Sequence, residues 1–316
     1  RLTYKGIRYK EYKSEMLTGA VFPQLEIGSK SDDIKAWAEH VEALEYDHIA
    51  MFDHILGINP KSQVGWKGPY DHTHSFHEPL VTMGYMSAVT KRVGFATSIL
   101  VLPQRQVALV AKQVSTLSEL SKRDIRLGVG SGWNKIEFEA VGHDFSTRGK
   151  KIEDQINIMR KLWSENSVNV DTEQHTISDA GINPLPDKSR IEIWLGGGAK
   201  PVLQRVGKIA DGWFANTSTR TAKLGIPAFS NDKYGISQLD IIRTAALDAG
   251  RDPTQIGVEV RVELEGKTPE EAADEVNKWS TIPEITAVQF STMRAGIKTV
   301  NGHIEALRKF MNALKS

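Results

Sequence analysis

The stretch Ile125-Arg-Leu-Gly-Val-Gly-Ser-Gly-Trp-Asn134 has the pattern of a buried strand that runs into a glycine-rich turn. Similar short runs of apolar and β-branched residues recur along the chain, and helix-like segments separate them. Eight strands in strict alternation with helices predict a parallel sheet, and eight is the number that closes a barrel. The predicted strands are Leu17–Phe22, Tyr46–Phe52, Val93–Val101, Ile125–Gly130, Ile191–Gly196, Asp211–Ala215, Gly257–Leu264 and Ile285–Ser291.

The segments between the predicted strands carry helix signals. Ser31–Leu44 opens with a serine and two aspartates, which favour a helix start, and then places Ile34, Trp37 and Val41 on one stripe. The turn after the first strand, Pro23-Gln-Leu-Glu26, lacks the glycine-rich sequence of an open dinucleotide-binding sheet. We therefore expect an α/β fold, a single (β/α)8 or TIM barrel. The other predicted helices are Val107–Leu120, Gly149–Trp163, Pro201–Ile209, Ser237–Ala249, Pro269–Trp279 and Gly302–Leu314.

Two segments are longer than a tight connection and predict insertions. Ile55–Glu78 follows the second strand, so in a barrel it would lie on the catalytic face. Asn166–Arg190 precedes the fifth strand and would start on the opposite face. We expect residues 16–316 to form the barrel domain and residues 1–15 to be an N-terminal extension.

The composition is that of an ordinary folded protein. The 316 residues are 40% hydrophobic and 25% charged, and 40 basic against 39 acidic side chains give a net charge of +1. This balance provides no general attraction for nucleic acid or anionic lipid, and no apolar run approaches the roughly 20 residues of a membrane helix. The absence of cysteine excludes disulfides, thiolate metal sites and cysteine nucleophiles. We expect a cytoplasmic protein with no nucleic-acid or membrane partner.

The second predicted strand ends in Asp53-His54, two adjacent titratable residues. Active sites of α/β barrels lie at the carboxyl ends of the strands. The pair is therefore a candidate proton donor or acceptor beside a hydrogen-bonding anchor. The alternative is an aspartate that caps the next element and a histidine packed beneath the loop.

Glycines follow the fourth and fifth predicted strands. Gly128, Gly130 and Gly132 alternate with other residues, a spacing that lets a ligand approach the main chain beside the hydroxyl of Ser131. The stretch Gly196-Gly-Gly-Ala-Lys-Pro-Val202 puts proline in the first turn of a predicted helix, whose free N–H groups and dipole favour an anion. A plain strand-to-helix turn is the alternative at both places.

Histidines also cluster in the first insertion. His72, His74 and His77 follow Asp53 and His54, so a metal site is a rival interpretation. Metal-hydrolase barrels gather carboxylate and histidine ligands from several strand ends, and the later strand ends of this chain do not offer them. We expect no metal.

Taken together in order, the strand-end motifs resemble the luciferase-like flavin and deazaflavin oxidoreductases of the bacterial luciferase superfamily. The resemblance covers roughly residues 16–315. The motifs are Leu127–Gly142 followed by Arg148-Gly149 and Gln155–Trp163, Leu102–Arg105 with Ala111–Leu117, and Leu195–Gly198 with Ala210–Trp213.

The resemblance implies an α/β barrel that binds coenzyme F-420 (a deazaflavin) or FMN at the strand ends. It implies a proton-handling role for His54, a non-proline cis peptide at Ser98–Ile99 beneath the cofactor ring, and a homodimer that acts on a small-molecule substrate. The implied cofactor contacts are Asp53, Ser98, Ile99, Ser131, Gly132, Gly197, Gly198, Ala199, Pro201 and Val202, and the implied substrate contacts are Trp133 and Asn216.

Two positions depart from the family pattern. Trp133 stands where the sugar-phosphate dehydrogenases of the family have glutamate, which argues against sugar-phosphate oxidation. Ser121-Lys-Arg-Asp124 replaces a common Ser-Gly-Gly-Arg on the far face. We expect hydride transfer between a deazaflavin or flavin and an organic substrate. The alternatives are an FMN-dependent monooxygenase, a non-catalytic flavin-binding barrel and, least favoured, a metal-dependent hydrolase.

Overall fold

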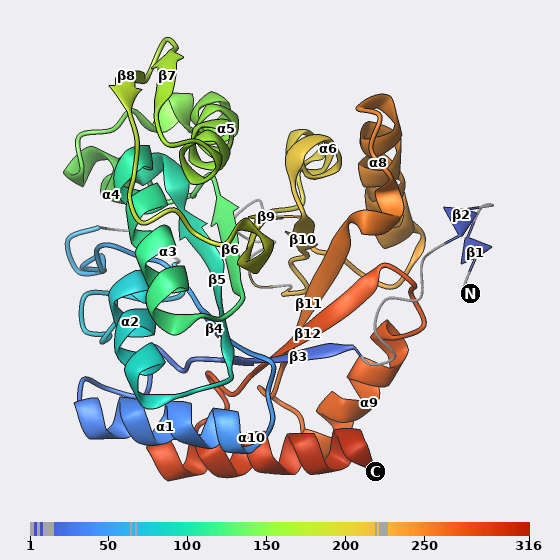
Figure 1. Ribbon diagram of the computed structural model, residues 1–316. Coiled ribbons are helices and arrows are strands. Elements are labelled where there is room, and N and C mark those ends of the chain that lie inside the picture. Colours follow the sequence, from blue (N-terminus) through green and yellow to red (C-terminus); the bar gives the residue numbers. More distant parts are fainter. Residues whose placement is uncertain are drawn as a thin grey trace.

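The protein is a closed barrel of eight parallel strands surrounded by helices, as seen in a computed structural model (Figure 1). The model describes residues 16–316 except Val64, Lys67, Thr219 and 221–226, together with the paired strands β1 (Thr3–Tyr4) and β2 (Ile7–Arg8). The rest of the predicted N-terminal extension lies outside the described residues. The predicted (β/α)8 barrel is confirmed. Its strands, in spatial order, are β10 (Gly212–Phe214), β11 (Gly257–Glu263), β12 (Ile285–Ser291), β3 (Leu17–Val21), β4 (His48–Met51), β5 (Gly94–Val101), β6 (Ile125–Gly130) and β9 (Ile191–Gly196).

The helices cover the outside of the barrel (Figure 1). The helix predicted from Ser237 begins earlier, because the carboxylate of Asp232 caps it by accepting hydrogen bonds from the N–H groups of Tyr234 and Gly235. The helices are α1 (Ser31–Ala43), α2 (Pro79–Val89), α3 (Val107–Ser121), α4 (Lys135–Ala140), α5 (Arg148–Ser164), α6 (Lys200–Ile209), α8 (Lys233–Asp248), α9 (Pro269–Trp279) and α10 (Val300–Lys315).

Helices α2 and α4 are additions to the predicted elements. Helix α2 was missed because its sequence is apolar on nearly every side: Leu80, Met83 and Met86 are buried, whereas Val81 and Tyr85 are exposed. The first insertion connects β4 with α2. The second contains an antiparallel pair, β7 (Val168–Asp171) and β8 (Thr176–Ala180), which lies beyond α5 in Figure 1.

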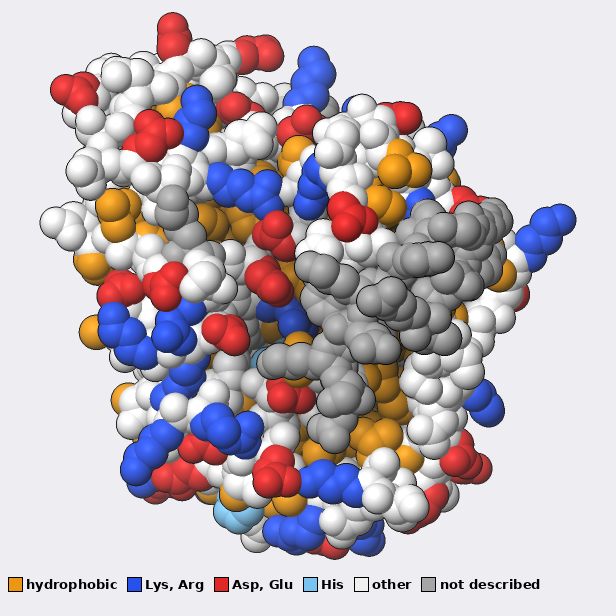
Figure 2. All heavy atoms as spheres, turned by 45° about the vertical axis from the view of Figure 1, so that its right-hand side comes forward, with side chains coloured by type: hydrophobic (Ala, Val, Ile, Leu, Met, Phe, Trp, Pro, Cys, Tyr) orange, Lys and Arg blue, Asp and Glu red, His pale blue; other side chains and the backbone are white. Residues whose placement is uncertain are grey.

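Two apolar cores hold the barrel together. The larger core lies between strands and helices and includes the valines of β11, Val258, Val260 and Val262. A much smaller core fills part of the barrel interior and includes Trp194 and Phe214. Among the described residues, none of the helices is long and apolar enough to cross a membrane. On the face shown in Figure 2, acidic and basic side chains are interspersed around a hollow with apolar walls.

Below the small core, the barrel interior is polar. The buried carboxylate of Glu259 on β11 lies 2.7 Å from Nε2 of His48 on β4 and also contacts the guanidinium of Arg126 on β6. Burial alone would raise the pKa of Glu259, but His48 and Arg126 lower it to about 2. Gly19 makes this arrangement possible, because a Cβ there would come within 2.3 Å of the His48 ring.

We predict that Glu259→Gln lowers the free energy of unfolding at pH 7 by roughly 3 kcal/mol, because it removes the buried anion that both His48 and Arg126 contact. The folded-state pKa of Glu259 lies below the unfolded-state value of 4.5. Its stabilisation is therefore complete above about pH 4.5 and is lost as the pH falls toward 2. Urea unfolding from pH 7 to pH 3 should show the wild-type and variant curves converging at the acid end. Glu192→Gln is the control, because Glu192 pairs with the same arginine from an exposed position.

Candidate active site

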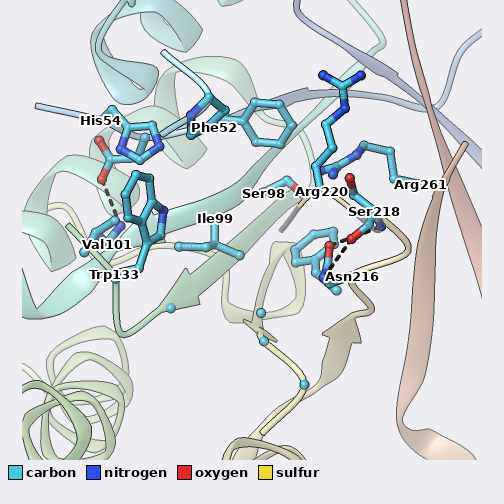
Figure 3. A pocket seen from close by; sticks show the side chains of 18 of the residues that line it. Phe52, His54, Ser98, Ile99, Val101, Trp133, Asn216, Ser218, Arg220 and Arg261 are labelled. Atoms are coloured by element: carbon cyan, nitrogen blue, oxygen red, sulfur yellow. Dashed lines mark hydrogen bonds between the residues drawn. The ribbon is translucent and has the colours of Figure 1, made fainter. Parts of the chain in front are cut away.

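A cavity of about 570 Å³ opens at the carboxyl ends of the barrel strands (Figure 3). Its size is typical of a site for a small organic ligand or cofactor. Pro201 is the one predicted site residue that does not line it, because it lies exposed in the first turn of α6. The predicted residues that line the cavity are Asp53, His54, Ser98, Ile99, Ser131, Gly132, Trp133, Gly197, Gly198, Ala199, Val202 and Asn216.

The peptide bond between Ser98 and Ile99 is cis, as predicted. It lies in β5 where the pairing with β6 shifts register, between Thr97 and Leu100. Figure 3 shows Ser98 and Ile99 between the two sides of the cavity. The side chain of Ile99 forms an apolar platform at the centre of the site.

The platform depends on two glycines that contact Ile99. A Cβ on Gly130 would lie 2.6 Å from Cδ1 of Ile99, and a Cβ on Gly196 would lie 2.6 Å from its Cγ2. A Cβ on Gly132 would likewise lie 2.5 Å from Cγ1 of Val101. Gly130 and Gly132 thus make room for side chains of the neighbouring strand β5, and because both also line the cavity, the approach of a ligand to the main chain there stays a prediction.

The N-terminus of α6 is open to an anion. Gly197 has a φ of +113°, and Ala199, at the N-cap position, provides no side-chain cap. Ala199 is exposed and lines the cavity. Pro201 has no N–H and the N–H of Val202 donates to the carbonyl oxygen of Ala199 at 2.8 Å, so the N–H of Lys200 and the helix dipole are what this terminus offers an anion. Gly198 is packed, because a Cβ there would lie 2.5 Å from the carbonyl oxygen of Pro227. The geometry fits a phosphate group of a bound cofactor.

His54 faces a buried glutamate that the sequence analysis did not find. Nδ1 of His54 lies 3.4 Å from Oε1 of Glu137 in α4 and 3.5 Å from its Oε2. The His54 side chain is 14% exposed and lines the cavity, whereas that of Glu137 is 1% exposed. The imidazole therefore connects the cavity with a carboxylate behind it.

Glu137 accepts several hydrogen bonds besides its contact with His54. The backbone N–H of Ile55 and the hydroxyl of Tyr70 donate to Oε1 at 2.9 and 3.0 Å, and Gln104 donates to Oε2 at 3.3 Å. Burial would raise the pKa of Glu137, but the contact with His54 and the hydrogen bonds from the N–H of Leu56 and from Gln104 lower it below its usual value. Glu137 therefore stays ionised and holds the His54 ring in place.

Aromatic rings surround His54 and form one wall of the cavity (Figure 3). Tyr70 stacks on the imidazole with a centroid distance of 3.8 Å, and Phe76 and Trp133 meet it edge-on at 5.2 and 5.7 Å. Trp66 of the first insertion stacks on Trp133 at 5.4 Å. The first insertion thus supplies most of an aromatic wall beside His54 and Glu137.

Asp53 and Asn216 line the cavity but serve mainly to organise it. The carboxylate of Asp53 accepts hydrogen bonds from the N–H of Val101 at 2.9 Å and from Nη2 of Arg105 at 2.8 Å. The side chain of Asn216 bonds within its own loop, where Ser218 donates to it at 3.3 Å. Both contacts lie beside the platform, so these residues position the walls of the site.

The histidines of the first insertion do not come together. Nδ1 of His74 lies 3.0 Å from Oδ1 of Asp71, and Nε2 of His77 lies 2.7 Å from the carbonyl oxygen of Gly28. Within the part of the chain that the structure describes, no group of three or more His, Asp or Glu side chains could hold a metal ion.

Comparison with known proteins shows the family. The family model described as luciferase-like monooxygenase matches residues 16–308. The chain therefore belongs to the luciferase-like monooxygenase family.

The relatives are distant. An uncharacterized protein of Mycobacterium bovis is 36% identical over 138 residues, which are 44% of this chain and 47% of that protein. An F420-dependent glucose-6-phosphate dehydrogenase of Amycolatopsis mediterranei is 27% identical over 189 residues, 58% of this chain and 53% of that enzyme. The match therefore spans only about half the length of these curated relatives.

Solved structures share the fold over nearly the whole chain. An F420-dependent secondary alcohol dehydrogenase has a TM-score of 0.73 at 16% identity and covers 96% of this chain and 100% of its own. A long-chain alkane monooxygenase has a TM-score of 0.70 at 13% identity and covers 94% of this chain and 91% of its own. At these sequence identities, the comparison shows that the fold is shared and nothing more.

The Ile99 platform can be tested by a double-mutant cycle. We predict that Gly196→Ala lowers the free energy of unfolding by about 1–3 kcal/mol, because its methyl group overlaps Cγ2 of Ile99. Ile99→Ala removes that overlap, so the double variant should be more stable than the sum of the two single effects predicts. Urea unfolding of the four proteins measures this coupling. Strict additivity would contradict the packing described here.

Proposed function

We propose that the protein is an oxidoreductase that transfers a hydride between a bound deazaflavin (coenzyme F-420) or flavin and an organic substrate. The observation that carries the proposal is the Ser98–Ile99 platform, which lies between the His54 wall and the open N-terminus of α6 within one cavity. A planar ring on the platform and a phosphate at the helix terminus match the shape and polarity of this cavity. The F420-dependent relatives support the proposal.

A bound flavin or deazaflavin would supply the hydride donor and acceptor, chemistry that protein side chains lack. The residues of this chain would supply the binding and the proton. Ile99 would support the ring from below, and the N-terminus of α6, through the N–H of Lys200 and the helix dipole, would bind the phosphate. Ser131 lines the same cavity and is well placed to contact the cofactor between these two points.

His54 would exchange a proton with the substrate during hydride transfer. Its ring lies at the cavity, Tyr70 stacks on it and Glu137 faces its Nδ1. A carboxylate behind an imidazole fixes the orientation of the ring. The network therefore suits a histidine that gains and loses a proton within one turnover.

The second candidate function is oxygen activation by an FMN-dependent monooxygenase, which the family description favours. Titrating the protein with FMN and with coenzyme F-420 distinguishes the cofactors by their absorbance. Oxygen consumption by the reduced complex then separates a monooxygenase from a dehydrogenase. Binding of neither cofactor would contradict both functions and favour a different class of barrel protein.

The proposed position of the cofactor phosphate can be tested with two substitutions of Ala199 that differ mainly in charge. We predict that Ala199→Asp weakens cofactor binding at least tenfold, about 1.4 kcal/mol, relative to Ala199→Asn. Both side chains cap α6 equally well and have nearly the same shape, so they differ mainly in charge. Fluorescence or absorbance titration measures the affinity. Equal affinity for the two variants would place the phosphate elsewhere.

We predict that His54→Asn lowers kcat by about 10²–10⁴-fold and changes cofactor affinity only a few-fold, because asparagine cannot exchange a proton near neutral pH. His40→Asn is the matched control, since His40 is exposed on α1 outside the cavity. Turnover and Tm are measured on the same preparations. Near-normal turnover with a large drop in Tm would assign His54 to packing instead.

A further inference from the structure

The wall of the cavity opposite His54 carries arginines that the proposed chemistry does not use. Figure 3 shows Arg261 and Arg220 on one side of the platform and His54 and Trp133 on the other. Arg294, in the loop after β12, also lines the cavity, and β12 is adjacent to β11, which carries Arg261. Arg220 is paired with Glu265, so of these three arginines Arg261 and Arg294 face the cavity with N–H groups to spare among the described residues.

Arg294 is a partly buried cation without a carboxylate partner. Its Nη2 donates to the carbonyl oxygen of Pro69 at 3.0 Å, and within the described part of the chain its guanidinium forms no ion pair. Glu26 accepts a hydrogen bond from the backbone N–H of Arg294 instead, at 2.9 Å. Burial and the charge of Arg220 lower the pKa of Arg294, against the more distant charges of Glu263, Glu26 and Glu265. Since none of these carboxylates forms an ion pair with it among the described residues, the guanidinium of Arg294 can bind an anionic group in the cavity.

Arg261 is also only partly satisfied. Its Nε lies 3.3 Å from Oε1 of Glu263, and its guanidinium lies 5.2 Å from the centre of the Phe52 ring. Among the described residues, its two Nη groups have no hydrogen-bond partner, and Figure 3 shows the side chain directed toward Phe52 and Ser98. The other inward carboxylate of β11, Glu259, is already held by His48 and Arg126. A guanidinium whose two Nη groups are both free to donate matches a carboxylate or phosphate.

We propose that Arg261 and Arg294 form a subsite for an anionic group of the substrate, a carboxylate or a phosphate ester, whose apolar planar body extends toward Tyr70 and Trp133. The proposal rests on the proposed function, because it names the substrate class of the same cavity. It separates two tasks within the cavity: the arginines anchor one end of the substrate, and the wall around His54 receives the other.

The test uses 2-naphthoate and its neutral isostere 2-naphthamide as probes in isothermal titration calorimetry, with the protein loaded with the cofactor that it binds. We expect the wild-type protein to bind the acid at least tenfold more tightly than the amide. Arg261→Gln and Arg294→Gln should each reduce this ratio to about threefold or less. Arg308→Gln, which makes the same change at an exposed ion pair on α10, should leave the ratio unchanged.

Competition by inorganic phosphate distinguishes the two sources of the anion. Displacement of 2-naphthoate by millimolar phosphate supports a subsite that accepts phosphate esters, and no displacement supports a subsite for carboxylates. Failure of the wild-type protein to bind 2-naphthoate, equal binding of acid and amide, or an unchanged ratio in both arginine variants would overturn the proposal. Variants that weaken cofactor binding but not the charge preference would also overturn it.

The experiment also separates this proposal from the proposed function. Cofactor affinity is measured first and independently by absorbance. If neither FMN nor coenzyme F-420 binds, the proposed function fails, whereas the naphthoate preference can still be measured on the cofactor-free protein. Near-ultraviolet circular dichroism confirms that each variant is folded, and if Arg294→Gln does not fold, Arg261→Gln still decides the outcome.

Discussion

The interaction on which the site most depends lies below it, where Glu259 meets His48 and Arg126 inside the barrel. These residues come from three strands, β11, β4 and β6, that are not neighbours in the sheet. The carboxylate of Glu259 therefore connects separate parts of the barrel wall across the interior. A buried carboxylate without such partners would be strongly destabilising. The cluster fills the lower barrel with paired charges, and Glu259 also lines the base of the cavity above it. The cavity therefore begins where the charged cluster ends.

Above this floor, the shape of the site follows from the packing around Ile99. The side chain fits between β6 and β9 only because Gly130 and Gly196 lack a Cβ. The platform, the helix terminus at Ala199 and the wall of rings around His54 are then held at fixed positions by rigid strands and their connections. A site that must hold a planar ligand against a reacting group benefits from such rigid support. Side chains from separate elements thus act on one cavity.

The cavity has two chemically different sides. The His54 side is aromatic and contains a histidine with a buried carboxylate behind it, whereas the opposite side carries guanidinium groups at β11 and after β12. Members of a family with one fold can act on different substrates, because the fold positions the strand ends and the loops supply the walls. In this chain the first insertion, with Tyr70, and the loop that carries Arg294 supply parts of these walls.

The sequence alone determined the barrel, because alternation of apolar runs and helical stripes is a local pattern that each segment displays by itself. It also placed His54 and the turn before α6 at strand ends, and the resemblance to the luciferase-like family implied the cis peptide at Ser98–Ile99. Only the tertiary structure decided that Glu137 stands behind His54, that Arg261 and Arg294 line the same cavity, and that Gly130 accommodates Ile99. These contacts join residues that are distant in the chain or on different strands, and folding is what brings such side chains together.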